Sequence, residues 1–145
     1  MEEKYKLLDL IHHDASMGAH TIDVLLKNLE DKDNKITPYL KAIKGKYATF
    51  EKEAKKILKS LNLDSKDPGL MAKIGSSMGI AKEVKDDNSD STIADMMIQG
   101  VNMGLVKIEK GLKDYASELD SKHKKLAKDF LEFQHSVIDN LKEYL

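Results

Sequence analysis

The chain has no cysteine, which excludes disulfide bonds, thiol chemistry and cysteine-ligated zinc. It also has no uninterrupted apolar run near the roughly 20 residues that a membrane-spanning helix needs. The first residues, Met1 to Lys4, lead directly into a helical pattern and do not resemble a secretory signal peptide. From these absences we expect a cytoplasmic protein with no membrane partner.

Arginine and tryptophan are absent as well, and phenylalanine occurs only three times. The 24 basic side chains are therefore all lysines, and 25 acidic ones bring the net charge to −1. Bidentate recognition of phosphate and guanine is mostly the work of arginine, and single-stranded nucleic acid is held by stacking on aromatic rings. We therefore expect no nucleic-acid partner, although a genome biased toward lysine codons explains the missing arginine equally well.

Apolar residues recur three and four positions apart along almost the whole chain, which is the pattern of amphipathic α-helices. A length of 145 residues suits one domain with a substantial core. We predict an all-α fold with a single domain over 1–145 and helices at about 3–30, 37–62, 68–84, 92–117 and 121–145. Thr37 before Pro38, and Thr92 with Asp95, are the predicted N-terminal caps of two of these helices.

The stretch between 62 and 91 differs from the rest, because turn-forming clusters at 64–69 and 85–91 flank a short helical pattern. One face of that pattern carries Leu70, Met71, Ile74, Met78, Ala81 and Val84. A helix of this length rises roughly 25 Å, enough to return the chain from one end of a bundle toward the other. We therefore predict a four-helix bundle with a short crossover helix between its second and third long helices.

Three segments resemble the ferritin-like superfamily: Lys66-Asp-Pro-Gly-Leu-Met, the helix end Ala81-Lys-Glu-Val with the acidic turn after it, and Met96-Met-Ile-Gln-Gly100. More narrowly, the chain is similar to a rubrerythrin-related group of uncharacterised bacterial four-helix domains. The resemblance implies a ferritin-like bundle. Active members of the superfamily hold two metal ions with a Glu from each of two helices and a Glu-x-x-His from each of the other two.

The ligands that such a di-iron centre requires are missing at several positions. Related sequences carry a Gly-Glu pair where this chain has Gly100-Val101, and Ala54 follows Glu51 where a histidine would complete the motif. The first helix offers His12 where a Glu is expected. The intact motif from Glu132 to His135 lies on the charged outer face of its helix, so we assign it to the surface. We expect no di-iron centre and no cofactor.

Three polar residues lie on or beside the predicted inner stripes, namely His12, Glu51 and Gln134. We interpret them as a small buried polar pocket whose members hydrogen-bond one another for structural reasons, because buried polar groups must find partners. The alternative is a degenerate ligand or metal pocket at the place where the superfamily keeps its metals. Gly100 and Gly104, four residues apart, predict the close approach of another helix.

Two helices are apolar on their outer faces, where charged side chains are usual. These second stripes consist of Leu10, His13, Met17, His20 and Val24, and of Met96, Gln99, Met103 and Val106. The crossover helix can cover one stripe or both, and any stripe left over predicts a homodimer interface with Leu10, Met17, Val24, Met96 and Met103. The spacing of His13, Met17 and His20 also suits a soft metal ion or haem iron, although three ligands on one helix are incomplete.

No serine lies in a strand-turn-helix elbow and no glycine-rich loop follows a strand, so we assign neither a hydrolase nor a phosphate-binding loop. We expect a non-catalytic ferritin-like bundle that acts by binding or assembly, for which the sequence specifies no small-molecule ligand. The alternative function is a metal- or haem-binding redox accessory protein that uses His12 or the face formed by His13, Met17 and His20.

Overall fold

The computed structural model describes the backbone of residues 1–64 and 70–145, and the side chains of 1–64 and 75–145. Within these residues the regular elements are all helical: α1 (Glu3–Asn28), α2 (Thr37–Ser60), α3 (Leu70–Asp86), α4 (Asp90–Tyr115), α5 (Ser121–Leu141) and the 3-10 turn η1 (Lys142–Tyr144). The prediction of an all-α fold is confirmed. None of the described helices is long and apolar enough to cross a membrane.

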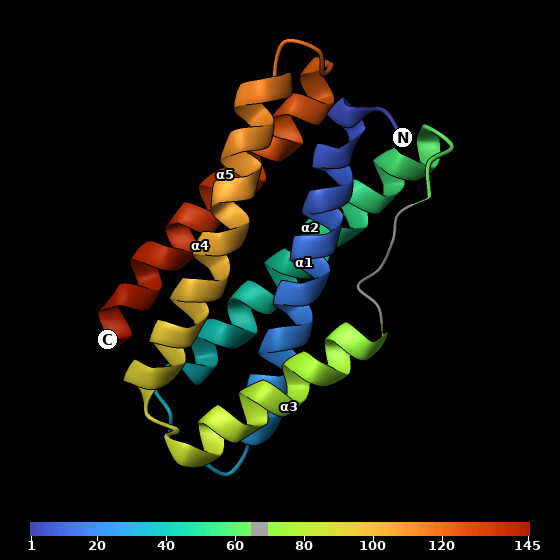
Figure 1. The fold of residues 1–145 in the computed structure, drawn as a ribbon. Coiled ribbons are helices and arrows are strands. Elements are labelled where there is room, and N and C mark those ends of the chain that lie inside the picture. Colours follow the sequence, from blue (N-terminus) through green and yellow to red (C-terminus); the bar gives the residue numbers. More distant parts are fainter. Residues whose placement is uncertain (65–69) are drawn as a thin grey trace.

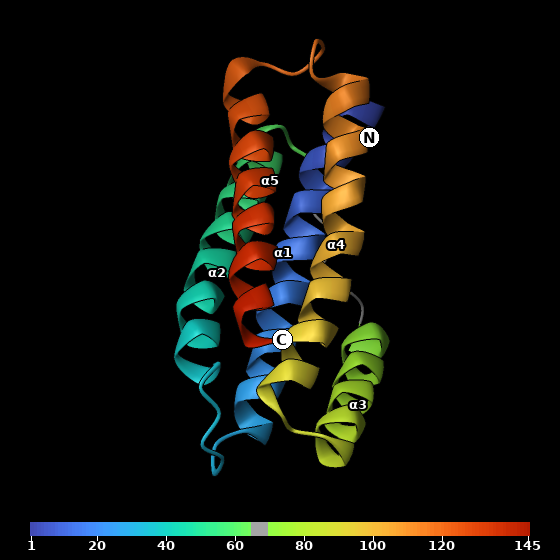
Figure 2. The same cartoon turned by 90° about the vertical axis from the view of Figure 1, so that its left-hand side faces the viewer.

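The four long helices lie side by side, as Figures 1 and 2 show. α1 packs mainly against α2, and α5 packs mainly against α4. α1 also contacts α4 and α5, and α5 also contacts α2. Adjacent helices run in opposite directions, whereas α2 and α4 run the same way (Figure 1). Because two helices with the same direction need a long connection between them, the chain passes through α3, which lies against α1 in the half of the molecule where α4 begins.

The turn before α4 is a network of capping hydrogen bonds. The Ser89 hydroxyl accepts from the Thr92 backbone N–H at 3.2 Å, and the Asp87 carboxylate accepts from the Thr92 hydroxyl at 2.6 Å. α4 therefore begins at Asp90 with Ser89 as its cap, and the predicted capping box of Thr92 and Asp95 is wrong. The Asp90 carboxylate in turn accepts from the Asn34 side chain at 2.9 Å, which ties this turn to the loop between α1 and α2.

Single residues also explain where α2 ends and where α5 begins. Asn62 has a φ of 57°, and Leu63 donates its N–H to the Leu58 carbonyl at 2.9 Å, which is the Schellman arrangement that ends a helix. Between α4 and α5 the break has no Gly or Pro, but the Asp120 carboxylate caps α5 by accepting from the His123 N–H at 2.9 Å. At the start of α2 the cap position is Ile36, with Pro38 in the first turn, so the predicted cap at Thr37 is wrong.

α1 contributes a wide face to the core. It contacts each of the other four helices, and its buried side chains include Leu7, Leu8, Ile11, Ala15, Ile22 and Leu25. The centre between α2 and α5 is aromatic: the Phe50 and Phe130 rings are 5.1 Å apart, and the Tyr47 and Phe133 rings are 4.9 Å apart. These ring pairs hold α5 against α2 at the level of the site described below.

Over its described side chains, from residue 75 onward, α3 buries only part of the face that its pattern predicts. Ile80 and Val84 belong to the core, whereas Met78, predicted on the same face, is 69% exposed. The side chains of Leu70, Met71 and Ile74 lie outside the described residues. One polar contact joins α3 to α1, a hydrogen bond of 2.9 Å between His20 Nε2 and the Ser77 hydroxyl.

Candidate functional site

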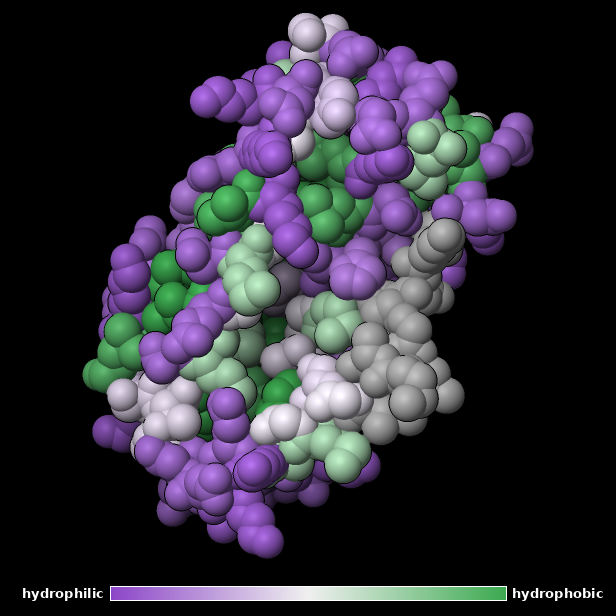
Figure 3. All heavy atoms as spheres, in the orientation of Figure 1, coloured by the Kyte–Doolittle hydropathy of each residue, from purple (hydrophilic) through white to green (hydrophobic). Residues whose placement is uncertain are grey.

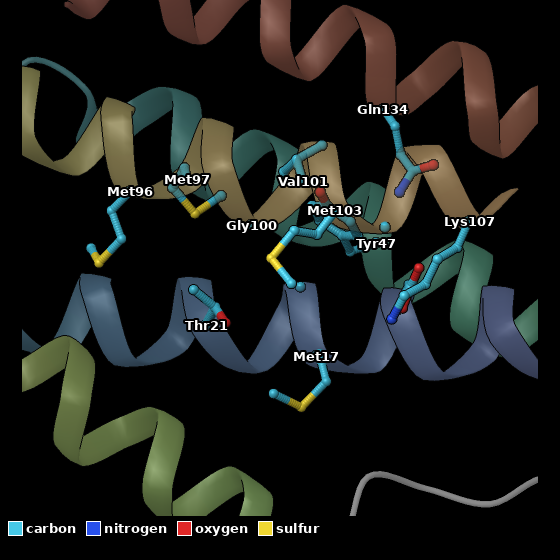
Figure 4. Close-up of a pocket in the computed structure, with 13 residues that line it drawn as sticks. Met17, Thr21, Tyr47, Met96, Met97, Gly100, Val101, Met103, Lys107 and Gln134 are labelled. Carbon is cyan, nitrogen blue, oxygen red and sulfur yellow. The ribbon is translucent and has the colours of Figure 1, made fainter. Parts of the chain in front are cut away.

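A cavity of about 260 Å³ opens between α1 and α4. Its walls come from all four long helices and consist of Asp14, Met17, Gly18, Thr21, Tyr47, Met96, Met97, Gly100, Val101, Met103, Gly104, Lys107 and Gln134. Figure 3 shows the surface hollowed at this place, with weakly hydrophobic side chains around the opening. The close-up in Figure 4 shows three methionines extending from α4, and Gln134 reaching in from α5. The cavity is therefore mainly apolar, with a few polar groups.

The polar groups converge on Gly104. A Cβ atom at this glycine would stand 2.7 Å from Asp14 Oδ2 and 3.2 Å from Gln134 Nε2. The missing side chain thus leaves room for a carboxylate from α1 and an amide from α5 to approach the same spot beside α4. The prediction that Gly100 and Gly104 admit another helix is wrong, because Gly104 faces these side-chain ends and a Cβ at Gly100 would meet nothing within 4 Å.

A second glycine shapes the opposite wall. A Cβ at Gly18 would lie 2.6 Å from the Tyr47 ring, so the ring of Tyr47 rests directly on the α1 backbone. Tyr47 is only 3% exposed, and burial raises the pKa of its hydroxyl, which therefore stays protonated at neutral pH. The Gly18 and Tyr47 pair brings α2 into a site that otherwise belongs to α1, α4 and α5.

Asp14 is the least well solvated charged group in the site. Burial raises the pKa of its carboxyl above the ordinary value of 3.8, while His13 and Lys107 partly offset this effect by their positive charge. His13 Nδ1 lies 3.6 Å from Asp14 Oδ1, and the Asp14 side chain is 17% exposed. Among the described residues, Asp14 Oδ2 and Gln134 Oε1 are buried oxygens without a hydrogen-bond partner.

Asp14→Asn is expected to raise the free energy of unfolding at pH 7 by about 1 kcal/mol, because it removes a poorly solvated charge. The folded protein holds the Asp14 proton more tightly than the unfolded chain does. The Asp14 carboxyl therefore makes its full favourable contribution to the free energy of unfolding below pH 3.8. This contribution is lost as the pH rises through the raised pKa of the carboxyl. Denaturant unfolding at several pH values should show the advantage of the variant growing over that range.

The control for this prediction is Asp139→Asn, since Asp139 has a 77% exposed side chain. It should change the free energy of unfolding little at any pH. The charged or titratable groups that face Asp14 are His13 on its own helix, Lys107 on α4 and Tyr47 on α2. A constant difference between wild type and Asp14→Asn from pH 3 to pH 7 would contradict a raised pKa for Asp14.

The three polar residues that were predicted to form one buried pocket differ in their burial and position. His12 is fully buried and Gln134 is 2% exposed, but Glu51 lies half-buried on α2. Of the three, only Gln134 lines the cavity. Its polar neighbour there is Asp14, a residue that the sequence analysis did not select.

His13, Met17 and His20 have separate surroundings. His13 is half-exposed beside Asp14, Met17 lines the cavity, and His20 is bonded to Ser77 of α3. No three His, Asp or Glu side chains gather as metal ligands within the described part of the chain. At the positions compared with di-iron proteins, Ala54 and Val101 are buried, and Glu132 and His135 are exposed. His135 pairs with Glu109 of α4 across the surface at 3.2 Å.

The five residues predicted to form a dimer interface differ in how exposed they are. Leu10, Val24 and Met96 are half-buried against the core, and Met17 is half-buried in the cavity wall. Met103 remains 67% exposed. In Figure 4 its side chain reaches from α4 across toward α1, at the mouth of the cavity. Of the second stripes, Met17 of α1 and Met96 and Met103 of α4 therefore lie in the wall of the same cavity.

Asp14 and Tyr47 are site residues that sequence reasoning missed. One available signal was Asp14 itself, a carboxylate next to the inner residue Ala15 and four residues before Gly18. On a helix, i and i+4 lie on the same face, so a charge there stands beside a residue without a side chain. Such a pair indicates a polar group that has been given space inside a bundle.

No known protein family, curated protein or solved structure matches this chain.

Proposed function

We propose that this chain is a non-catalytic, ferritin-like helical bundle without a di-iron centre, and that it acts by binding a small molecule in the cavity between α1 and α4. The observation that carries the proposal is the cavity itself, with about 260 Å³ of space, a mainly apolar wall and two buried oxygens without partners. Ligand sites have this character: mostly apolar, concave, with a few polar groups that fix orientation.

The helix arrangement supports the ferritin-like part of the proposal. A bundle whose second and third long helices run the same way, joined by a long crossover, is the connectivity of that superfamily. At two positions where the resemblance places metal ligands, this chain has the buried apolar residues Ala54 and Val101. This substitution favours a binding role over oxidation at paired metals.

Methyl NMR tests the proposal directly, because four of the seven methionines line the cavity. Protein labelled with 13C at the methionine methyl groups is titrated with two small amphiphiles, 1-hexanol and 1-hexylamine. We expect saturable shifts at Met17, Met96, Met97 and Met103 with at least one of them. The exposed Met1 and Met78 should not move with the same saturation curve.

Gly100→Leu is the blocking variant. Gly100 lines the cavity, and a Cβ there meets nothing within 4 Å, so the leucine enters open space instead of clashing. We expect the affinity for either amphiphile to fall at least about tenfold while the fold is retained, since leucine is a better helix former than glycine. Gly45→Leu is the matched control, because Gly45 also has open space but lies outside the cavity. The proposal fails if neither amphiphile binds saturably, or if Gly100→Leu binds like the wild type.

Assembly is a second candidate function, and we propose a homodimer. Met103 and Val106 are 67% and 53% exposed on neighbouring turns of α4, and large apolar side chains grouped in this way favour a protein interface. Met103→Lys is expected to shift the protein to a monomer in light scattering, because a lysine charge would be buried between the copies. Ala48→Lys, an equal change on the exposed face of α2, should leave the mass unchanged. A wild-type monomer at every concentration would contradict this proposal.

A further inference from the structure

The two buried oxygens without partners limit which molecule can fill the cavity. Asp14 Oδ2 and Gln134 Oε1 both accept hydrogen bonds, and an ionised carboxylate or an amide oxygen cannot donate one. A buried polar atom without a partner raises the free energy of the folded state. The complementary ligand must therefore bring hydrogen-bond donors, at least two of them, to this end of the cavity.

The two side chains are close enough for one ligand group to reach both. Asp14 Oδ2 and Gln134 Nε2 lie 2.7 Å and 3.2 Å from the same point above Gly104, although they come from α1 and α5. Gln134 Oε1 belongs to that same planar amide, and the Gln134 side chain is almost completely buried. Turning the amide plane by half a rotation places Oε1 where Nε2 now lies, so that a donor group beside Gly104 can contact both oxygens.

Charge decides between a neutral donor and a cationic one. Burial disfavours the ionised carboxyl of Asp14, and His13 and Lys107 offset this effect only in part, so a hydroxyl group that supplies a neutral donor leaves part of the penalty in place. Lys107 lines the cavity and is exposed. His13 approaches the other carboxylate oxygen, Oδ1. Oδ2 is buried without a protein donor, so a cation reaches it only when side chains at the cavity mouth move aside; the charge-assisted hydrogen bond that it then forms is the strongest kind available.

The polarity and size of the rest of the cavity indicate what the remainder of the ligand is like. Met96, Met97 and Val101 form a wall without charge, and methionine side chains adjust their shape to different apolar groups. An engineered protein cavity of about 150 Å³ holds one benzene molecule. At about 260 Å³, this cavity suits an apolar tail somewhat larger than a benzene ring.

From this geometry we propose that the ligand is a primary amine in its ammonium form with a short apolar tail, whose N–H groups donate to Asp14 Oδ2 and Gln134 Oε1. The proposal rests on the proposed binding function and adds the chemical class of the ligand. It predicts three separate features of recognition: a positive charge, more than one N–H donor, and a tail of about six carbon atoms.

Four probes built on a chain of six carbon atoms separate these features. In the methionine-methyl titration, 1-hexylamine is expected to bind at least about tenfold more tightly than 1-hexanol, because its hydrogen bonds are charge-assisted. Hexyltrimethylammonium has the charge but no N–H group, and should bind at least about tenfold more weakly than 1-hexylamine. Sodium hexanoate, with the opposite charge, should bind more weakly than the alcohol.

Asp14→Asn is the decisive variant, and its fold is checked first by the dispersion of the methionine signals. It should lose the preference for the amine, so that 1-hexylamine and 1-hexanol bind within about threefold of each other. Asp139→Asn should keep the full preference, since that carboxylate is exposed on the outer face of α5.

The outcomes distinguish this inference from the function on which it rests. If 1-hexanol binds the wild type as tightly as 1-hexylamine, the amine assignment is overturned and the binding function stands. If hexyltrimethylammonium equals 1-hexylamine, charge alone acts and the hydrogen-bond assignment is overturned. If no probe shifts the cavity methionines, both proposals fail together. An amine preference that survives in Asp14→Asn would also overturn the inference.

Discussion

Phe130→Ala is expected to lower the free energy of unfolding by about 3–5 kcal/mol, the range for deleting a fully buried phenylalanine. Phe130 on α5 is 0% exposed, and its ring lies 5.1 Å from that of Phe50 on α2. Removing the ring loses both the burial of its surface and the contacts of the atoms around it. The neighbouring rings cannot close the gap completely, because Phe133 is held against Tyr47 at 4.9 Å.

A domain of this size has a total stability of roughly 5–15 kcal/mol, so the variant should stay folded at room temperature but melt at least about 8 °C lower. Urea unfolding followed by circular dichroism measures the loss. Phe50→Ala is the matched control, because Phe50 is only half-buried and should cost clearly less. Equal losses for the two variants would mean that the core is not centred on α5 at Phe130.

The same glycine-to-alanine change is expected to have opposite effects at two places in the cavity wall. Gly18→Ala places a methyl group 2.6 Å from the ring of Tyr47, which is too close for any real contact. The ring is buried and cannot swing into solvent, so we expect a net loss of about 1–3 kcal/mol of unfolding free energy. Gly100→Ala meets nothing within 4 Å and should instead gain about 0.5–1 kcal/mol from helix propensity.

Thermal melts of the two variants give the comparison, and each serves as the control for the other. Because Tyr47 lines the cavity, Gly18→Ala should also move the methyl signals of the methionines nearest that ring. A stabilised Gly18→Ala would show that α1 and α2 can move apart without cost, and that the Tyr47 contact does not define the site.

Much of the architecture could be predicted because the signals are local. The three-and-four spacing indicates helices, and the apolar stretch between two turn clusters indicates the crossover. The break before α5 was placed correctly near Asp120 although no Gly or Pro marks it. Caps were less reliable, because Ser89 and Thr92 are both good capping residues and only the chain direction after Asp87 decides between them.

The site could be predicted only in part. Gln134 was identified because a polar residue on an apolar stripe is visible in one helix. The predicted partners His12 and Glu51 do not line the cavity, whereas Asp14 and Tyr47 do. Helical periodicity tells which face of a helix a residue occupies, but it says nothing about the height at which two helices face each other. That height decides which polar residues meet.

The amino-acid sequence by itself determined that this protein is built of helices, roughly where each begins and ends, and which faces are apolar, because these depend on contacts between residues near each other in the chain. Tertiary structure alone decided that Met17 of α1 and Met96 and Met103 of α4 line the same cavity. It also decided that Asp14 and Gln134 meet beside Gly104. Residues 14, 104 and 134 are far apart in sequence, and only the packing of whole helices sets their separation.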